Sequence, residues 1–313
     1  MIIPKFFDKY TCLQATLKNI FDYYSIEDKF LFINDWTFIY GKKNNNIQFG
    51  RRVKVNYNID ILKKFYERGY GFKIEAREGI KDVLGQIEKE IQYGKPVLVK
   101  IDSYWCPWNR AYQKFHIDHF FVVIGINESD FICIDSYFSD HIEYLPIKYI
   151  KHCQLGFISL ESEKKKIDKT NIINLMNKSL ESNKELQSIE QLTSFWLDIE
   201  NGLNFREEIS EYNDTRLIPL LINLKHISNS RYNYADFLKY ISLQYNIYNL
   251  SDLYYKYMAA HQKWEIVRAL FFKCMNLNNI ECEIKRITNL IKQIIGIERN
   301  ALLRIIEVVE ASR

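Results

Sequence analysis

Apolar residues follow two different spacings along this chain, and the spacing changes near residue 160. In the first part, short apolar runs alternate with stretches of helical spacing, which predicts an α+β domain. Helices are expected at 12–24, at 59–68, where Gly69 would stop the second, and across IKDVLGQIEKEIQYG. The predicted strands are WTFIY, GFKIEA, KPVLVKID, HFFVVIGI, DFICID and LGFISL.

Beyond residue 160 the strand pattern disappears, and apolar residues recur every three or four positions, which predicts helices packed in a bundle. The clearest helical stretches are RLIPLLINLKHI, ADFLKYISLQYNIY and IKRITNLIKQIIGIERNALLRIIEVVE. Pro219 would start or kink the first of them. The run ESEKKKIDKT, with four lysines, has the composition of a surface connection. We therefore expect an N-terminal domain at 1–160 and an all-helical domain at 161–313.

A cysteine opens the first predicted helix. Cys12 follows Thr11 and precedes apolar residues at helical spacing, so it falls in the first turn. The unpaired N–H groups and the positive end of the dipole at a helix start stabilise a thiolate, which is the nucleophilic form of the thiol. A lone cysteine near an N-terminus is more often a small buried apolar residue. The choice between these interpretations depends on the residues that accompany it.

Those residues stand in the segment HIDHFFVVIGINESDFICIDSYF, in which two apolar runs flank the turn at 127–130. The pattern predicts a β-hairpin, with His119 leading its first strand and Asp135 ending its second. These two positions can lie side by side in an antiparallel pair. Cys12, His119 and Asp135 then fit the roles of a nucleophile, its base and the residue that orients the base, which favours the catalytic interpretation.

Composition narrows the class of protein. The chain is 47% hydrophobic and 26% charged, as expected for a globular protein. It has no apolar run of about eighteen residues and no signal-peptide pattern at its start, so we expect a cytoplasmic protein. The net charge of +4 does not indicate nucleic-acid binding; a mildly positive surface would suit an acidic partner and would equally suit no partner in particular.

The six cysteines show no zinc-ligand spacing and are expected to be reduced. Cys133, Cys274 and Cys282 fit structural positions, whereas Cys106, in YWCPWN, is a candidate for a second exposed thiol without a base. His116 and His119 could form half of a metal site, but strand residues three apart point to opposite faces, which argues against this and predicts no metal. His116 is expected instead in a loop lining the approach to the site.

The placement of Cys12, His119 and Asp135 resembles the papain-like clan, and within it the double-glycine leader peptidases and their non-peptidase relatives. The sequence YGKPVLVKIDSYWCPWN ahead of DHFFVVIGI is similar to a smaller group, the acyltransferases of the butirosin-biosynthesis type, and to amide synthases of the closthioamide-biosynthesis type. Two residues depart from the clan: Ser136 replaces a common proline, and Phe6 occupies the place of the oxyanion-hole glutamine. Gln14 does not match that glutamine by motif.

The resemblance implies a papain-like N-terminal domain, with an antiparallel sheet and a Cys-bearing helix, ahead of the helical domain. It also implies ATP-independent amide formation in antibiotic biosynthesis, such as that of nonribosomal peptides. An acyl or peptidyl carrier protein would donate the acyl group and a small amine would accept it. The only cofactor would be the phosphopantetheine on the donor, and no membrane or nucleic acid would be bound.

A long aromatic loop leads directly into His119 and is placed to wall the site. It carries the candidate substrate-binding residues Tyr104, Trp105, Trp108, Tyr112 and His116. These rings could equally pack between the two domains. The same Cys-His-Asp arrangement also fits a hydrolase, either peptidase or thioesterase, and a non-catalytic binding protein is a third alternative.

Overall fold

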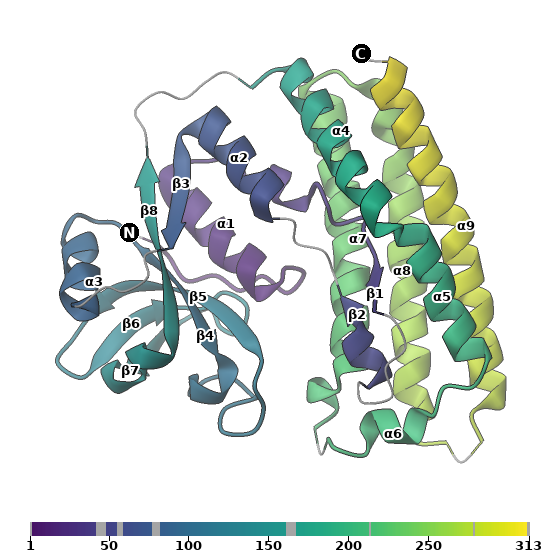
Figure 1. The fold of residues 1–313 in the computed structure, drawn as a ribbon, viewed down its shortest axis with the longest axis horizontal. Coiled ribbons are helices and arrows are strands. Elements are labelled where there is room, and N and C mark those ends of the chain that lie inside the picture. The colour runs from purple at the N-terminus through teal and green to yellow at the C-terminus, as the bar shows by residue number, and fades with distance from the viewer. Residues whose placement is uncertain are drawn as a thin grey trace. The chain divides into compact units, whose positions relative to one another are not determined.

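The computed structural model of the chain describes residues 2–41, 48–54, 59–76, 82–160, 167–212, 214–277 and 279–311. The chain forms two compact units, Met1–Asp28 with Leu62–Lys166, and Lys29–Ile61 with Ile167–Arg313. We call them the sheet unit and the helical unit. The expected α+β class, an antiparallel sheet with a Cys-bearing helix followed by a helical region, is confirmed (Figure 1).

The main sheet has six strands in the order β3-β8-β4-β5-β6-β7, and every neighbouring pair is antiparallel. The strands are β3 (Phe72–Ala76), β4 (Val97–Asp102), β5 (Asp118–Ile126), β6 (Asp130–Ile134), β7 (Ile142–Pro146) and β8 (Cys153–Leu160). Of these six strands, the apolar pattern failed to predict one, β7. It lies at the edge of the sheet and exposes Ile142 and Tyr144, so its apolar pattern does not mark a buried face.

Three helices accompany this sheet: α1 (Cys12–Tyr24), α2 (Ile59–Tyr70) and α3 (Val83–Gln92). Phe21 of α1 contacts both Tyr66 of α2 and Phe72 of β3, with ring centroids 4.5 and 5.0 Å apart. The prediction that Gly69 stops α2 is wrong. Its last residue is Tyr70, and Gly71 follows with a φ of +62°, the left-handed geometry that only glycine adopts without strain.

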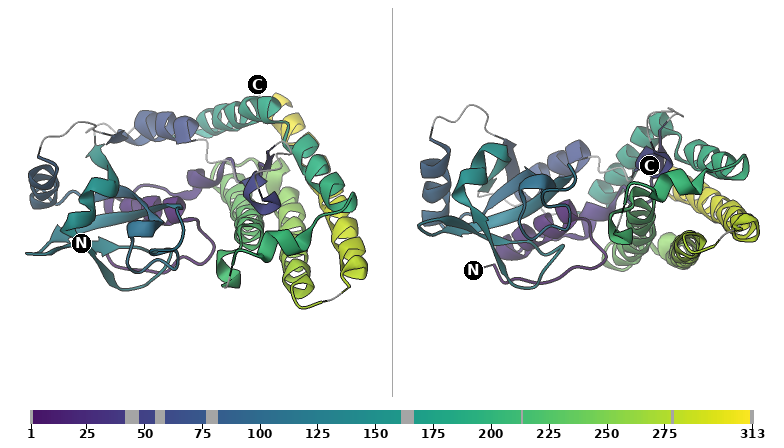
Figure 2. Two further views of the ribbon diagram at one scale, coloured as in Figure 1. Left: turned by 60° about the horizontal axis from the view of Figure 1, so that its bottom comes forward. Right: turned by 90° about the horizontal axis from the view of Figure 1, so that it is seen from below.

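The helical unit contains six α-helices among its described residues: α4 (Lys169–Leu186), α5 (Ser188–Glu200), α6 (Phe205–Ile209), α7 (Pro219–Gln244), α8 (Ser251–Cys274) and α9 (Glu281–Ala311). Pro219 starts α7 at its first position, where no intrahelical N–H bond is lost. Two of the predicted helical stretches are parts of this one helix. Helices α7 and α8 lie side by side in every view (Figures 1 and 2).

The segment 29–61 belongs with these helices, although we expected it within a domain at 1–160. It contributes the short pair β1 (Ile39–Tyr40) and β2 (Val53–Lys54), which contact α5 and α7 respectively. The expected strand 36–40 is thus reduced to its last two residues.

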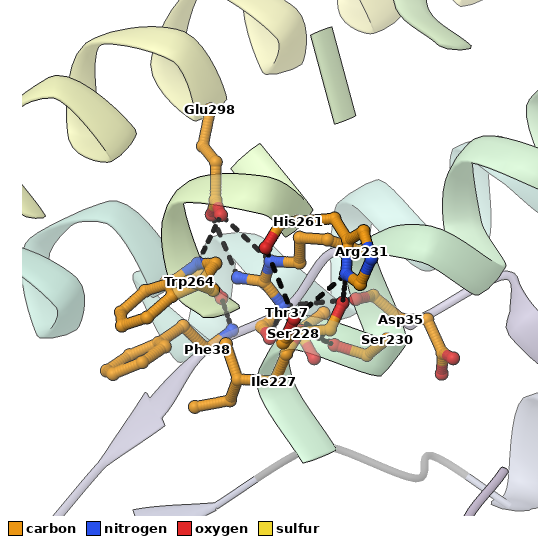
Figure 3. Close-up of polar contacts among 11 residues, drawn as sticks. Asp35, Thr37, Phe38, Ile227, Ser228, Ser230, Arg231, His261, Trp264 and Glu298 are labelled. Carbon is orange, nitrogen blue, oxygen red and sulfur yellow. Dashed lines mark hydrogen bonds and ion pairs between the residues drawn. The ribbon is translucent and has the colours of Figure 1, made fainter. Parts of the chain in front are cut away.

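A buried ion pair joins this segment to the helices. The Arg231 guanidinium of α7 makes a bidentate pair with Glu298 of α9, through two bonds of 2.8 Å. It also donates to the backbone oxygens of Asp35 and Thr37, at 3.1 and 2.8 Å, and Trp264 donates to Glu298 (Figure 3). Arg231 and Glu298 are only 0% and 3% exposed, so water does not stabilise their charges. Each charge is stabilised instead by the other, and that of Arg231 also by the two backbone oxygens.

Arg231→Met is therefore expected to lower the free energy of unfolding of the helical unit by about 3–5 kcal/mol, because it leaves the Glu298 carboxylate buried without its cation. Urea unfolding followed by circular dichroism measures this loss. The double variant Arg231→Met/Glu298→Met should be clearly more stable than the single variant, since it buries no lone charge. Equal destabilisation of both variants would contradict the argument, and Arg304→Met, at an exposed pair on α9, is the control.

None of the described helices combines the length and apolarity needed to cross a membrane. All six cysteines are free thiols. The interpretation of Cys106 as an exposed thiol is wrong: its side chain is fully buried in the core of the sheet unit, and burial strongly raises its pKa. The neighbouring apolar strands and tryptophans take up the space around it, so it is a structural residue.

Candidate active site

A reciprocal pair of hydrogen bonds fixes where α1 begins. The Thr11 hydroxyl accepts from the Gln14 backbone N–H at 3.3 Å, and the Gln14 side-chain oxygen accepts from the Thr11 N–H at 3.1 Å. This capping box makes Cys12 the first helical residue. The first turn contains no acidic residue, so the positive end of the helix faces the thiol without a competing charge.

The β5–β6 hairpin brings His119 and Asp135 together. His119 is the second residue of β5, and Asp135 directly follows β6, whose last residue, Ile134, pairs with Val122. The His119 Nε2 lies 2.5 Å from the Asp135 Oδ2, and the two residues are 2% and 1% exposed. The expected adjacency is therefore present, and the carboxylate can hold the ring in one orientation and one tautomer.

Helix α1 packs against β5, and the Cys12 thiol lies within hydrogen-bonding reach of the His119 ring. The bond from Nε2 to Asp135 leaves Nδ1 as the nitrogen for the thiol. Burial alone would lower the pKa of His119, but the Asp135 carboxylate, by its charge and hydrogen bond, and Cys12 raise it to about 10. The imidazolium form is thus strongly favoured at neutral pH.

Trp108 holds the same carboxylate from the aromatic loop. Its indole Nε1 donates to the Asp135 Oδ2 at 2.6 Å, and its ring packs on Phe121 with centroids 5.3 Å apart. The other oxygen, Oδ1, accepts from the Tyr137 backbone N–H at 3.2 Å. The carboxylate is therefore fixed by three donors, two of which share Oδ2. Trp108 thus contacts the orienting residue directly.

Trp108→Phe is expected to lower the kcat/KM of a reaction that uses Cys12 and His119 about tenfold. The aromatic ring remains, but one charge-assisted hydrogen bond to Asp135 is lost. The Tm should fall only slightly. Steady-state kinetics together with thermal unfolding would separate the two effects. The matched control is Trp196→Phe, because Trp196 packs against the core of the helical unit and its Nε1 has no hydrogen-bond partner among the described residues. Equal losses in both variants would show that the Nε1 donor has no special role.

Residues 11–136 match a protein family described as butirosin biosynthesis protein H, N-terminal. The matched range contains Cys12, His119 and Asp135 and ends at Ser136. The match supports the resemblance to the butirosin group over these residues, which include the segment 29–61 of the helical unit; β7, β8 and helices α4 to α9 lie outside it. No curated protein matches the chain.

The other rings of the aromatic loop contact each other and the neighbouring segments. Tyr104 stacks on His116, with centroids 4.7 Å apart, and the His116 Nδ1 lies 2.6 Å from Asp102. The Tyr112 hydroxyl lies 3.1 Å from that of Tyr149. His116 is exposed and precedes β5, as expected of a loop residue. The described residues hold no group of three or more His, Cys, Asp or Glu suited to a metal ion.

Two positions bear on oxyanion stabilisation. Phe6, at the place of the clan's glutamine, is 53% exposed and carries no polar group. The side-chain oxygen of Gln14 takes part in the capping box. The first N–H groups of a helix have no intrahelical acceptor, so the Cys12 N–H points out of the start of α1. This is the donor that the geometry offers beside the thiol.

Proposed function

We propose that the sheet unit is a cysteine-dependent acyltransferase that makes amides without ATP, and that it takes the acyl group from a carrier-protein thioester. The buried His119–Asp135 pair beside Cys12, at the start of α1, is the observation that supports this most directly. The family match to a butirosin-biosynthesis protein supports a biosynthetic role for the chemistry. The donor would bring its own phosphopantetheine, and the protein itself needs no cofactor for these steps.

In the first half-reaction the Cys12 thiolate attacks the thioester carbonyl carbon. The Cys12 N–H stabilises the developing oxyanion. The bond from carbon to the phosphopantetheine sulfur breaks, and that sulfur takes the proton from the His119 imidazolium. The product is an acyl-Cys12 thioester together with the free thiol of the carrier.

In the second half-reaction the amine nitrogen attacks the acyl carbon, and neutral His119 takes the proton that the nitrogen loses. The bond from carbon to the Cys12 sulfur breaks, which releases the amide and restores the thiolate–imidazolium pair. Cys12 raises the pKa of His119, and acylation removes this influence, so the pKa of the ring falls after it has given its proton to the leaving thiol. Conversion of a thioester to an amide is downhill, which explains why ATP is not required.

The proposal is tested by incubating the protein with an acyl-carrier thioester and following intact mass. Transfer predicts an acyl adduct on Cys12 that persists without amine and resolves to amide when a primary amine is added. Release of free acid at the same rate with or without amine would instead assign a hydrolase with the same three residues. Failure to form any adduct would overturn the acyl-enzyme route.

A further inference from the structure

One buried hydrogen bond connects the helix of Cys12 with the corner that carries Asp135. The Asn19 side-chain amide of α1 donates to the Ser136 hydroxyl at 2.7 Å, and both residues are only 2% exposed. The two residues are 117 positions apart in sequence. Asn19 lies two helical turns beyond Cys12, on the same face of α1, while Ser136 follows Asp135 directly.

A second contact acts on the same corner. The Ser136 backbone oxygen accepts from the Phe7 N–H at 2.8 Å, which fixes the extended segment that leads into α1. Ser136 thus forms hydrogen bonds with the chain on both sides of Cys12, with Phe7 ahead of it and with Asn19 beyond it. Tyr23, near the end of α1, bonds elsewhere, to the Gly94 oxygen.

Two neighbouring residues, Asp135 and Ser136, thus hold the two partners of the proposed nucleophile–base pair. Asp135 orients His119 through its side chain, and the next residue holds the helix that carries Cys12. A shift of α1 along β5 by about 1 Å would leave the His119–Asp135 pair intact but separate the thiol from Nδ1, and misplacement of this size costs on the order of a hundredfold in rate. A buried amide that bonds a buried hydroxyl holds such a register more rigidly than apolar packing, because a lost partner leaves an unsatisfied polar group.

We propose that Asn19 and Ser136 are positioning residues, whose hydrogen bond holds Cys12 against His119. This inference rests on the proposed acyl transfer, but the contact can be measured without it. Cys12 raises the pKa of His119, so the influence of the thiol on the imidazole reports directly on the distance between them. The pKa of His119 by NMR is therefore a readout that needs neither carrier protein nor amine.

The experiment compares the pKa of His119 with and without the Cys12 thiol, in wild type and in Asn19→Ala. In wild type, Cys12→Ala should lower the pKa of His119. In the Asn19→Ala background the same substitution should lower it clearly less, because the thiol has already moved away. Ser136→Ala should behave like Asn19→Ala, whereas Ser136→Thr, which keeps the hydroxyl, should retain the wild-type response.

Tyr23→Phe is the matched control, because it removes another hydrogen bond of α1, at the end remote from Cys12. It should leave the response of His119 unchanged. Acyl transfer by Asn19→Ala should fall about tenfold to a hundredfold in kcat with little change in KM. The positioning role would be overturned if Cys12→Ala lowered the pKa of His119 as much in the Asn19→Ala background as in wild type. It would also be overturned if Tyr23→Phe weakened this response as much as Asn19→Ala does. If wild type shows the His119 response but forms no acyl adduct, the proposed function fails while the positioning role survives.

Discussion

Cys12→Ala should lower the rate of amide formation by about 10⁴-fold or more and remove the acyl adduct altogether, because it removes the thiol on which the proposed covalent intermediate forms. The position of Cys12 in the structure explains why the reaction should depend on it. Cys12 is the first residue of α1, its thiol is partly exposed, and His119 and Asp135 are already paired beside it. The alanine variant should remain folded, because the capping box is formed by Thr11 and Gln14.

Cys12→Ser sharpens the test. It keeps the size of the side chain and a hydroxyl beside His119, but an alcohol loses its proton far less readily than a thiol. We expect its rate to stay within about tenfold of the alanine variant. Cys282→Ala is the control, since Cys282 is an exposed free thiol on α9 and should not affect the rate. Amide formation by Cys12→Ala within tenfold of wild type would exclude Cys12 as the nucleophile.

The parts of this site that sequence could predict are those set by local pattern. Polar Thr11 ahead of apolar residues at helical spacing marked the start of α1, and two apolar runs around a turn marked the hairpin that pairs His119 with Asp135. Each depends on residues close together in sequence. Local preference and tertiary packing agree there, so the spacing alone was sufficient.

The parts that could not be predicted depend on contacts between distant segments. The assignment of 29–61 to the helical unit rests on bonds such as that from Arg231 to Thr37, which are 194 positions apart. The role of Trp108 was hidden for a related reason: an indole in an aromatic loop predicts packing, and nothing in its neighbourhood reveals a carboxylate partner 27 residues away.

Asn19 did leave a signal in the sequence. It is a polar residue on the apolar face of α1, two turns beyond Cys12, and a polar residue at such a position needs a buried partner. Pattern reasoning could have marked Asn19 as exceptional. The identity of its partner, Ser136, required the structure.

The second large effect is expected from Asp135→Asn, which should lower the rate of amide formation at neutral pH by about 10³- to 10⁴-fold. In wild type the Asp135 carboxylate is the main cause that raises the pKa of His119, against a burial that lowers it. With an amide at position 135, burial prevails and the ring is neutral at neutral pH. The amide can also present its NH₂ group to the ring nitrogen, which favours the wrong tautomer.

The pH dependence gives this prediction a direction. In wild type His119 should keep its proton until the pH approaches its pKa, so activity falls as pH rises through about 10. In Asp135→Asn the descending limb should move to lower pH, and the control Asp140→Asn, at an exposed carboxylate, should leave it in place. A descending limb at the wild-type position in Asp135→Asn would contradict the assignment of Asp135.

The free energy of unfolding should also depend on pH through the protonation of His119. The pKa of His119 is raised from 6.5 to about 10 in the folded protein, so its contribution to the free energy of unfolding is complete below pH 6.5 and is lost as pH rises through about 10. Asp135→Asn should abolish this loss of stability between pH 6.5 and 10, measured by urea unfolding at several pH values. Because unfolding requires no substrate, this result would test the His119–Asp135 pair independently of which acyl group and amine are used in an activity assay.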